Sequence, residues 1–122
     1  MGDRGNIVIR DTDKKEVFLY SHWGGTGLPQ LAQEVLRKNQ RWNDPAYLAR
    51  LLFCRMVKGQ EDNELGYGIS TSRCDYEHWD IVVNVGKQTV FFRDPKRGTS
   101  KSLGGFEQFC SLTPEQFKKL GY

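Results

Sequence analysis

The segment at residues 21–29, Ser-His-Trp-Gly-Gly-Thr-Gly-Leu-Pro, constrains the fold most because it ends one regular element and opens another. An apolar run precedes it, and after it apolar residues recur at the three-and-four spacing of a helical face. Three glycines in four positions let the backbone approach a bound group, and the first helical turn offers unpaired N–H groups. We therefore expect a strand, a turn and a helix, with a small anion bound at the turn.

The rest of the chain divides into short apolar runs and amphipathic stretches. Runs at residues 7–9 and 17–20 flank a charged segment and predict an antiparallel hairpin. The further elements expected are two helices, from 28 to 39–41 and from 44 to 58, and three strands, at 66–72, 79–85 and 88–93. The second helix is apolar nearly all round, which predicts packing on several sides. Glycine first in Gly86-Lys87 predicts a type II′ turn between the last two strands.

This order of elements predicts an α+β fold, with an antiparallel sheet of about five strands, two main helices on one face and a short C-terminal helix. The 122 residues suit one domain, 1–122, in which residues 94–122 form an exposed basic loop and a docking tail. Three phenylalanines, Phe106, Phe109 and Phe117, are expected to dock that tail on the body or on a neighbouring subunit. A capping box at 113–116 opens the last helix.

Bulk properties exclude several classes of protein. No run is long enough to cross a bilayer, and the first residues lack a secretion signal, so we expect a cytoplasmic protein without a membrane partner. An odd number of cysteines in that compartment predicts buried free thiols. A net charge of +3 is too small to indicate a nucleic-acid partner. The acidic residues around His78 lack metal-ligand spacing, so we expect neither a metal nor a cofactor.

Candidate ligand-binding residues gather around the glycine turn and at the ends of the strands. Six belong to the turn itself: His22, Trp23, Gly24, Gly25, Thr26 and Gly27. Arginines at strand ends or turns, Arg4, Arg73 and Arg93, are expected to be accessible phosphate clamps, with Tyr67 and Phe91 as stacking surfaces. The alternatives are a plain tight turn, a structural histidine and aromatic rings in the core. Arg50 and Arg55, on the apolar helix, are expected in internal salt bridges.

Four segments together resemble a family of small phage and prophage proteins. They are Gly2-Asp3-Arg4-x-Asn6-Ile7, Leu19-Tyr20-x-His22-Trp23-Gly24-Gly25, Arg41-Trp42-x-Asp44-Pro45-x-Tyr47-Leu48-Ala49-Arg50 and Gly66-Tyr67-Gly68-Ile69-Ser70-Thr71. Among such proteins the chain looks most like the anti-Thoeris sponges of the first type. That resemblance implies a homo-oligomer in the host cytoplasm that sequesters a cyclic nucleotide or an ADP-ribose-derived signal without cleaving it.

The leading hypothesis is thus an anti-defence protein, not an enzyme, that captures a phosphate-bearing cyclic nucleotide. Sequestration requires phosphate donors, aromatic planes and a preorganised pocket, but no nucleophile, general base or metal. One alternative is an enzyme that hydrolyses such a nucleotide, with His22 or His78 as general acid or base. The other is an inhibitor that binds a host defence protein through the basic tail and exposed aromatic residues.

Overall fold

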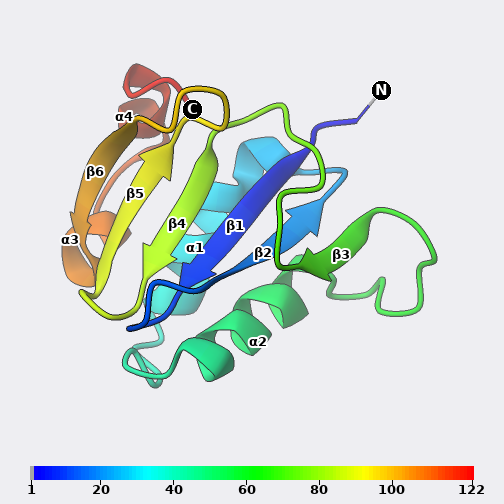
Figure 1. Ribbon diagram of the computed structural model, residues 1–122, viewed down its shortest axis with the longest axis horizontal. Coiled ribbons are helices and arrows are strands. Elements are labelled where there is room, and N and C mark those ends of the chain that lie inside the picture. The colour runs from blue at the N-terminus through cyan, green and yellow to red at the C-terminus, as the bar shows by residue number, and fades with distance from the viewer. Residues whose placement is uncertain (1) are drawn as a thin grey trace.

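The computed structural model describes residues 2–122 as a six-stranded mixed sheet with helices packed against one face (Figure 1). In chain order the elements are β1 (Gly5–Arg10), β2 (Glu16–Ser21), the 3₁₀ turn η1 (Gly25–Gly27), α1 (Leu28–Leu36), α2 (Pro45–Met56), β3 (Tyr67–Ser70), β4 (Asp80–Asn84), β5 (Thr89–Arg93), β6 (Ser100–Gly105), α3 (Phe106–Cys110) and α4 (Pro114–Lys119). The strand order is β3-β2-β1-β4-β5-β6. Neighbouring strands run antiparallel except β1 and β4, which are parallel.

The expected α+β class is confirmed, but the expected sheet of about five antiparallel strands is wrong in two respects. The sixth strand, β6, comes from residues predicted to form an exposed loop. The parallel pair arises because the chain leaves β3 at one edge and crosses to the far side of β1 before forming β4. The hairpin of β1 and β2 forms as predicted.

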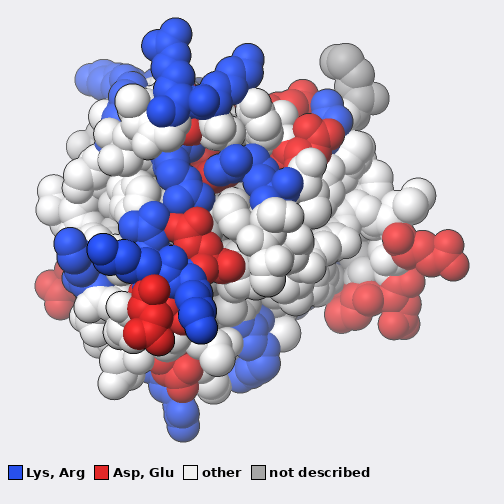
Figure 2. Space-filling view, viewed as in Figure 1, with Lys and Arg blue, Asp and Glu red and all other residues white. Residues whose placement is uncertain are grey.

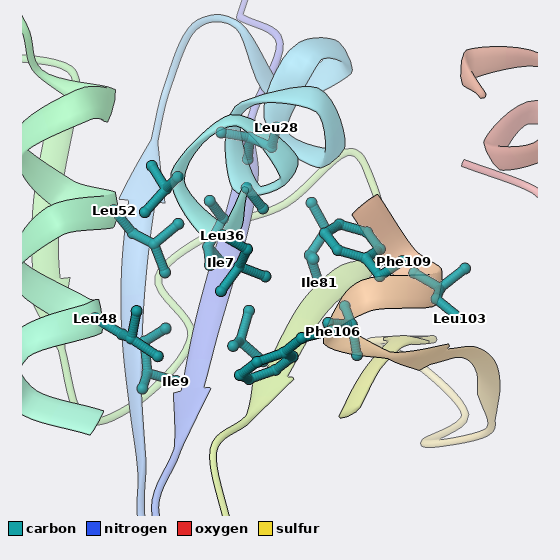
Figure 3. Packing of buried hydrophobic residues seen from close by; sticks show 14 of the residues in the cluster. Ile7, Ile9, Leu28, Leu36, Leu48, Leu52, Ile81, Leu103, Phe106 and Phe109 are labelled. Atoms are coloured by element: carbon teal, nitrogen blue, oxygen red, sulfur yellow. The ribbon is translucent and has the colours of Figure 1, made fainter. Parts of the chain in front are cut away.

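The main core lies between the sheet and the helices (Figure 3). Because side chains alternate along a strand, Ile7 and Ile9 of β1 and Ile81 of β4 all point to the helix side. Leu28 and Leu36 of α1 pack onto this surface, together with Leu48 and Leu52 of α2 and Phe106 and Phe109 of α3. All ten residues labelled in Figure 3 are buried. At about 25 cal/mol per Å² of apolar surface, this burial supplies most of the driving force for folding.

Both main helices start where their sequence signals predict but end earlier. Pro29 lies in the first turn of α1, and Oδ1 of Asp44 accepts a hydrogen bond from the Tyr47 N–H at the start of α2. The prediction that α2 packs on several sides is wrong. Only Leu48, Leu52 and Met56 are buried, because α2 covers the β1–β2 side of the sheet and leaves its outer side exposed.

The C-terminal segment docks on the body as expected. Phe106, Phe109 and Phe117 are all buried, and the capping box between Thr113 and Gln116 opens α4. The short helix α3 was not expected. None of the helices in the described part of the chain combines the length and the apolar run needed to cross a membrane.

Two smaller expectations are also wrong. The turn between β4 and β5 is not type II′, because the left-handed residue is Gln88, at φ 52°, and Gly86 has no positive φ. The three cysteines are free, but Cys54 and Cys74 are exposed rather than buried.

Candidate functional site

The sheet face opposite the helices is covered by side chains alone. Val8, Phe18 and Val82 form a small buried cluster on this face, with Phe91 packed against it. Guanidinium groups lie over the aromatic rings, with the Arg73 Cζ 5.4 Å from the centre of Phe18. Figure 2 shows Lys and Arg side chains spread across this face with acidic groups between them. Long cationic side chains thus shield the apolar cluster from water.

A chain of ion pairs fixes these guanidinium groups. Glu16 binds Arg10 at 2.7 Å and Arg93 at 2.9 Å, and the fully buried Asp80 binds both Arg73 and Arg93. Burial raises the pKa of Glu16, but the hydrogen bonds from Arg93 and Arg10 outweigh burial and leave that pKa below its ordinary value. Each charge in the chain has an opposite charge beside it, which offsets the cost of removing it from water.

The arginines expected as accessible phosphate clamps, Arg4, Arg73 and Arg93, already bind carboxylates of the chain itself. Arg73 and Arg93 are committed to the ion pairs of the sheet face, and Arg4 binds Asp75 and Glu77. Phe91, expected to stack on a ligand, is half-buried, with the Arg10 Cζ 5.3 Å from its ring centre.

Three amides of the glycine turn, those of Gly25, Thr26 and Gly27, already have acceptors within the chain and do not form the expected open anion site. The Gly25 N–H donates to the backbone oxygen of Asp3 at 2.7 Å, and the Thr26 N–H donates to the Asp3 carboxylate at 2.9 Å. The Gly27 N–H is bonded to the Gly24 oxygen at 3.0 Å. An added Cβ at Gly25 would lie 2.6 Å from the Asp3 oxygen, so this glycine admits the N-terminal segment rather than a ligand.

The turn does hold an anion, but that anion is the chain's own Asp3. Its second carboxylate oxygen lies 2.5 Å from Nε2 of His78, and the His78 ring stacks on Tyr122. Burial raises the pKa of Asp3, yet the hydrogen bond from the Thr26 N–H and the nearby His78 ring outweigh burial and leave it lowered. Burial also raises the pKa of Tyr122, whose hydroxyl donates to the Gly25 oxygen at 2.5 Å. The charge-binding chemistry predicted for the turn is thus satisfied internally.

The remaining predicted site residues lie together near the β3 edge. Nδ1 of His22 is 3.0 Å from the Tyr20 hydroxyl, and the ring of Trp23 packs edge to face with those of His22 and Tyr67. His22 is half-buried and Trp23 is exposed. Trp23 and Tyr67 thus lie at the β3 edge, whereas Phe91 packs against the cluster of Val8, Phe18 and Val82 on the open sheet face.

A cleft of ligand size lies instead between the segment before β4 and the loop between β5 and β6. It has a volume of about 440 Å³ and is lined by residues 76–79 and 94–97. The segment before β4 contributes the aromatic residues Tyr76, His78 and Trp79 to its lining, and the loop contributes the cations Lys96 and Arg97. We call this the 76–97 cleft. Rings and cations in one cleft match the base and the phosphate of a nucleotide.

The cations of this cleft are not neutralised by its acids. Glu77 accepts two hydrogen bonds from Arg4, and Oδ1 of Asp94 accepts from the backbone N–H groups of Lys96 and Arg97. Within the described residues, the side chains of Lys96 and Arg97 form no ion pair. Asp94 thus shapes the turn while leaving two positive charges directed to solvent, a favourable arrangement for an anion.

Sequence reasoning missed Tyr76, Trp79, Lys96 and Arg97 as site residues. The stretch around His78 and the basic stretch after Arg93 were both interpreted as solvated loops. The signal that could have found the cleft is Asp94-Pro95-Lys96-Arg97-Gly98, a turn sequence directly after a strand. The antiparallel pairing of β4 with β5, in which Asp80 lies opposite Arg93, brings this turn beside residues 76–79.

The expected salt bridges of α2 are found for one arginine of two. Arg55 binds Glu34 at 3.0 Å, whereas Arg50 lies over the ring of Tyr47. Across the described residues, no group of three His, Cys, Asp or Glu side chains is arranged to hold a metal ion. The chain matches no family model, no curated protein and no solved structure.

Proposed function

We propose that the protein binds a phosphate-bearing cyclic nucleotide in the 76–97 cleft and holds it without cleaving it. The observation that carries this proposal is the cleft itself, where three aromatic residues and two cations without ion-pair partners in the described chain line a volume of about 440 Å³. A base would stack on Tyr76, and a phosphate would lie against Lys96 and Arg97. The resemblance to phage sponge proteins adds the biological role, the removal of an immune signal from the host.

Preorganisation of the cleft supports tight binding. The turn that carries Lys96 and Arg97 is held by Asp94, whose backbone oxygen also accepts from the Gly98 N–H at 2.8 Å. On the opposite wall, Trp79 is partly buried against the core and the Lys101 ammonium lies 4.8 Å from its ring centre. Because both walls are fixed before the ligand arrives, little ordering entropy is lost on binding.

The test is to incubate the folded protein with cyclic dinucleotides, cyclic ADP-ribose isomers and ADP-ribose, remove free ligand, denature the protein and analyse what is released. We expect one class of nucleotide to be retained and released intact. The variant Lys96→Ala with Arg97→Ala should weaken binding about tenfold or more, since two phosphate contacts are lost. Tyr76→Ala should weaken it by about 1–3 kcal/mol if a base stacks there.

The matched control is Lys118→Ala with Lys119→Ala, which removes two consecutive exposed cations from α4. This variant carries the same change in net charge, so it separates a local phosphate contact from general electrostatic attraction. The proposal would be refuted if the two double variants weakened nucleotide binding equally, or if the folded protein retained no nucleotide.

A hydrolytic function is the second candidate, and the pair of Asp3 and His78 favours it. A carboxylate 2.5 Å from one histidine nitrogen orients the ring so that the other nitrogen can transfer a proton, and His78 lines the same cleft. The same experiment separates the two functions, because a hydrolase releases altered ligand. Loss of turnover with retained binding in His78→Gln would then identify His78 as the general acid or base.

A further inference from the structure

Large apolar side chains are exposed at one place on the described surface. Trp23, Leu65 and Ile69 are exposed by 42%, 70% and 60%. Ile69 belongs to β3, Leu65 lies two residues before it, and Trp23 packs against Gly66 and Tyr67. We call these three residues the β3 patch. Contiguous exposed apolar side chains at a sheet edge are a usual mark of an interaction surface.

The two edges of the sheet differ in a way that supports this interpretation. The β6 edge presents Ser100, Lys101 and Ser102, and it is interrupted by Gly104 at φ 84°. Polar and charged residues with an irregular backbone keep an edge strand from pairing with another chain. The β3 edge carries an exposed isoleucine and no charged residue, and the backbone groups on its outer side have no strand partner among the described residues.

An apolar groove continues the β3 patch under α2. Two adjoining hollows of about 270 and 290 Å³ share Val17, Ala46 and Ala49, and Ile69 lines one of them. We call this the α2 groove. Its cations Lys15 and Arg50 form no ion pair within the described residues, whereas its acids are already engaged, Asp11 by backbone N–H groups and Glu16 by arginines. The groove is therefore apolar with a positive rim.

The loop before β3 carries the complementary chemistry. Glu61, Asp62 and Glu64 are exposed and lack ion-pair partners in the described chain, and Leu65 follows them. Figure 2 shows acidic side chains gathered on the projection that this loop makes beyond the sheet. An apolar residue preceded by carboxylates matches an apolar groove with a positive rim.

Strand register connects the two surfaces. In the β2–β3 pairing, Ser70 lies opposite Phe18, so the direction beyond Ser70 leads along β2 toward Val17 and Lys15. Suppose that β3 of one copy pairs antiparallel with β3 of a second copy. Residues 61–66 of the second copy then extend beyond Ser70 of the first, toward its Val17 and Lys15. Leu65 of each copy then reaches the α2 groove of the other, and the acidic loop approaches Lys15 and Arg50.

We propose that the protein forms a twofold dimer through its β3 edges, in which each copy inserts Leu65 and its acidic loop at the α2 groove of the other. Such an interface is self-complementary, as twofold symmetry requires. It shares no residue with the 76–97 cleft, so it does not depend on the proposed function.

The test is the molar mass of the full chain in solution, measured by light scattering and by sedimentation over a range of concentrations. We expect a dimer whose dissociation constant rises about a hundredfold in Ile69→Lys, because both copies lose an apolar contact and gain like charges at the symmetry axis. The matched control, Ser102→Lys on the other edge strand, should leave the constant unchanged. Ile69 is exposed in the single chain, so its replacement should not unfold the protein.

Charge reversal tests the orientation of the dimer. Arg50→Glu and Glu64→Arg should each weaken dimerisation, and the two changes together should restore it. A monomer at all concentrations, a dimer insensitive to Ile69→Lys, or a dimer disrupted by Ser102→Lys would each overturn the proposal. Failure of the combined charge variant to recover the dimer would overturn the placement of the acidic loop.

Discussion

Gly25→Ala should destabilise the protein, whereas Gly27→Ala, two residues later in the same turn, should not. An added Cβ at Gly25 would lie 2.6 Å from the Asp3 oxygen, 2.8 Å from Cδ2 of His78 and 3.1 Å from the backbone carbon of Arg4. Two of these neighbours are backbone atoms, so relief of the clash requires the N-terminal segment to move. An added Cβ at Gly27 meets no atom within 4 Å, and its φ of −93° suits any residue.

The magnitude follows from the contacts that this movement breaks. They are the Gly25 N–H to the Asp3 oxygen, the Thr26 N–H to the Asp3 carboxylate, and the contact of that carboxylate with His78. A neutral hydrogen bond contributes about 1 kcal/mol, and the two charged contacts count for less than their buried values because Asp3 is partly exposed. We therefore expect a loss of about 3 kcal/mol for Gly25→Ala. Gly27→Ala should change stability by between zero and a gain of about 1 kcal/mol.

The assay is urea denaturation followed by tryptophan fluorescence, with amide exchange at Thr26 as a local readout. Gly25→Ala should also expose the Thr26 amide to faster exchange, because its acceptor is displaced. Equal stability of the two variants, within about 0.5 kcal/mol, would refute the conclusion that Asp3 fills the turn. A free anion cradle would give the opposite pattern, with stability retained and anion binding lost.

Three further predictions concern the sheet face, the pH dependence and the core. Asp80→Ala should destabilise the fold by about 3 kcal/mol in urea denaturation, because it leaves the half-buried guanidinium groups of Arg73 and Arg93 without their shared carboxylate. The folded-state pKa values of Glu16 and Asp3 are lowered, so the unfolded chain binds more protons in acid, and stability should fall as the pH drops below about 4.5. Denaturation midpoints that are equal at pH 7 and pH 3 would contradict this. Leu52→Ala should cost about 2–5 kcal/mol because Leu52 is fully buried, whereas the exposed Leu65→Ala should cost less than about 0.5 kcal/mol in the monomer.

The sequence predicted correctly those elements that depend on residues close together in the chain. The hairpin of β1 and β2, the Asp44 cap of α2 and the capping box at Thr113 all form where residues within a few positions require them. The sixth strand was missed because Ser100–Gly105 has the polar composition of a loop and is a strand only through its pairing with β5. Parallel pairing of β1 with β4 likewise depends on a crossover that no short pattern records.

The site at the glycine turn was predicted wrongly for the same reason, because the group that occupies it comes from a distant part of the chain. The glycine turn has the chemistry to bind an anion, and it does bind a carboxylate, but the carboxylate comes from Asp3, more than twenty positions upstream. Likewise, Arg73 and Arg93 looked accessible because their partner Asp80 lies on a neighbouring part of the sheet. A sequence shows which groups could bind a charge, whereas only the fold shows which of them already do.

The ion pairs that neutralise one sheet face make that face unfavourable for a phosphate. A six-stranded sheet with helices on one side has a second face, and here arginines stacked on Phe18 and Phe91 cover it. A phosphate that bound these arginines would take them from Asp80 or Glu16. The free-energy cost of leaving such a carboxylate unpaired exceeds the gain from an exposed arginine–phosphate pair. The unpaired cations Lys96 and Arg97 carry no such penalty. Phosphate binding is therefore expected at the 76–97 cleft, and replacing Lys96 and Arg97 should reduce it without lowering stability, whereas replacing Arg93 should lower stability first.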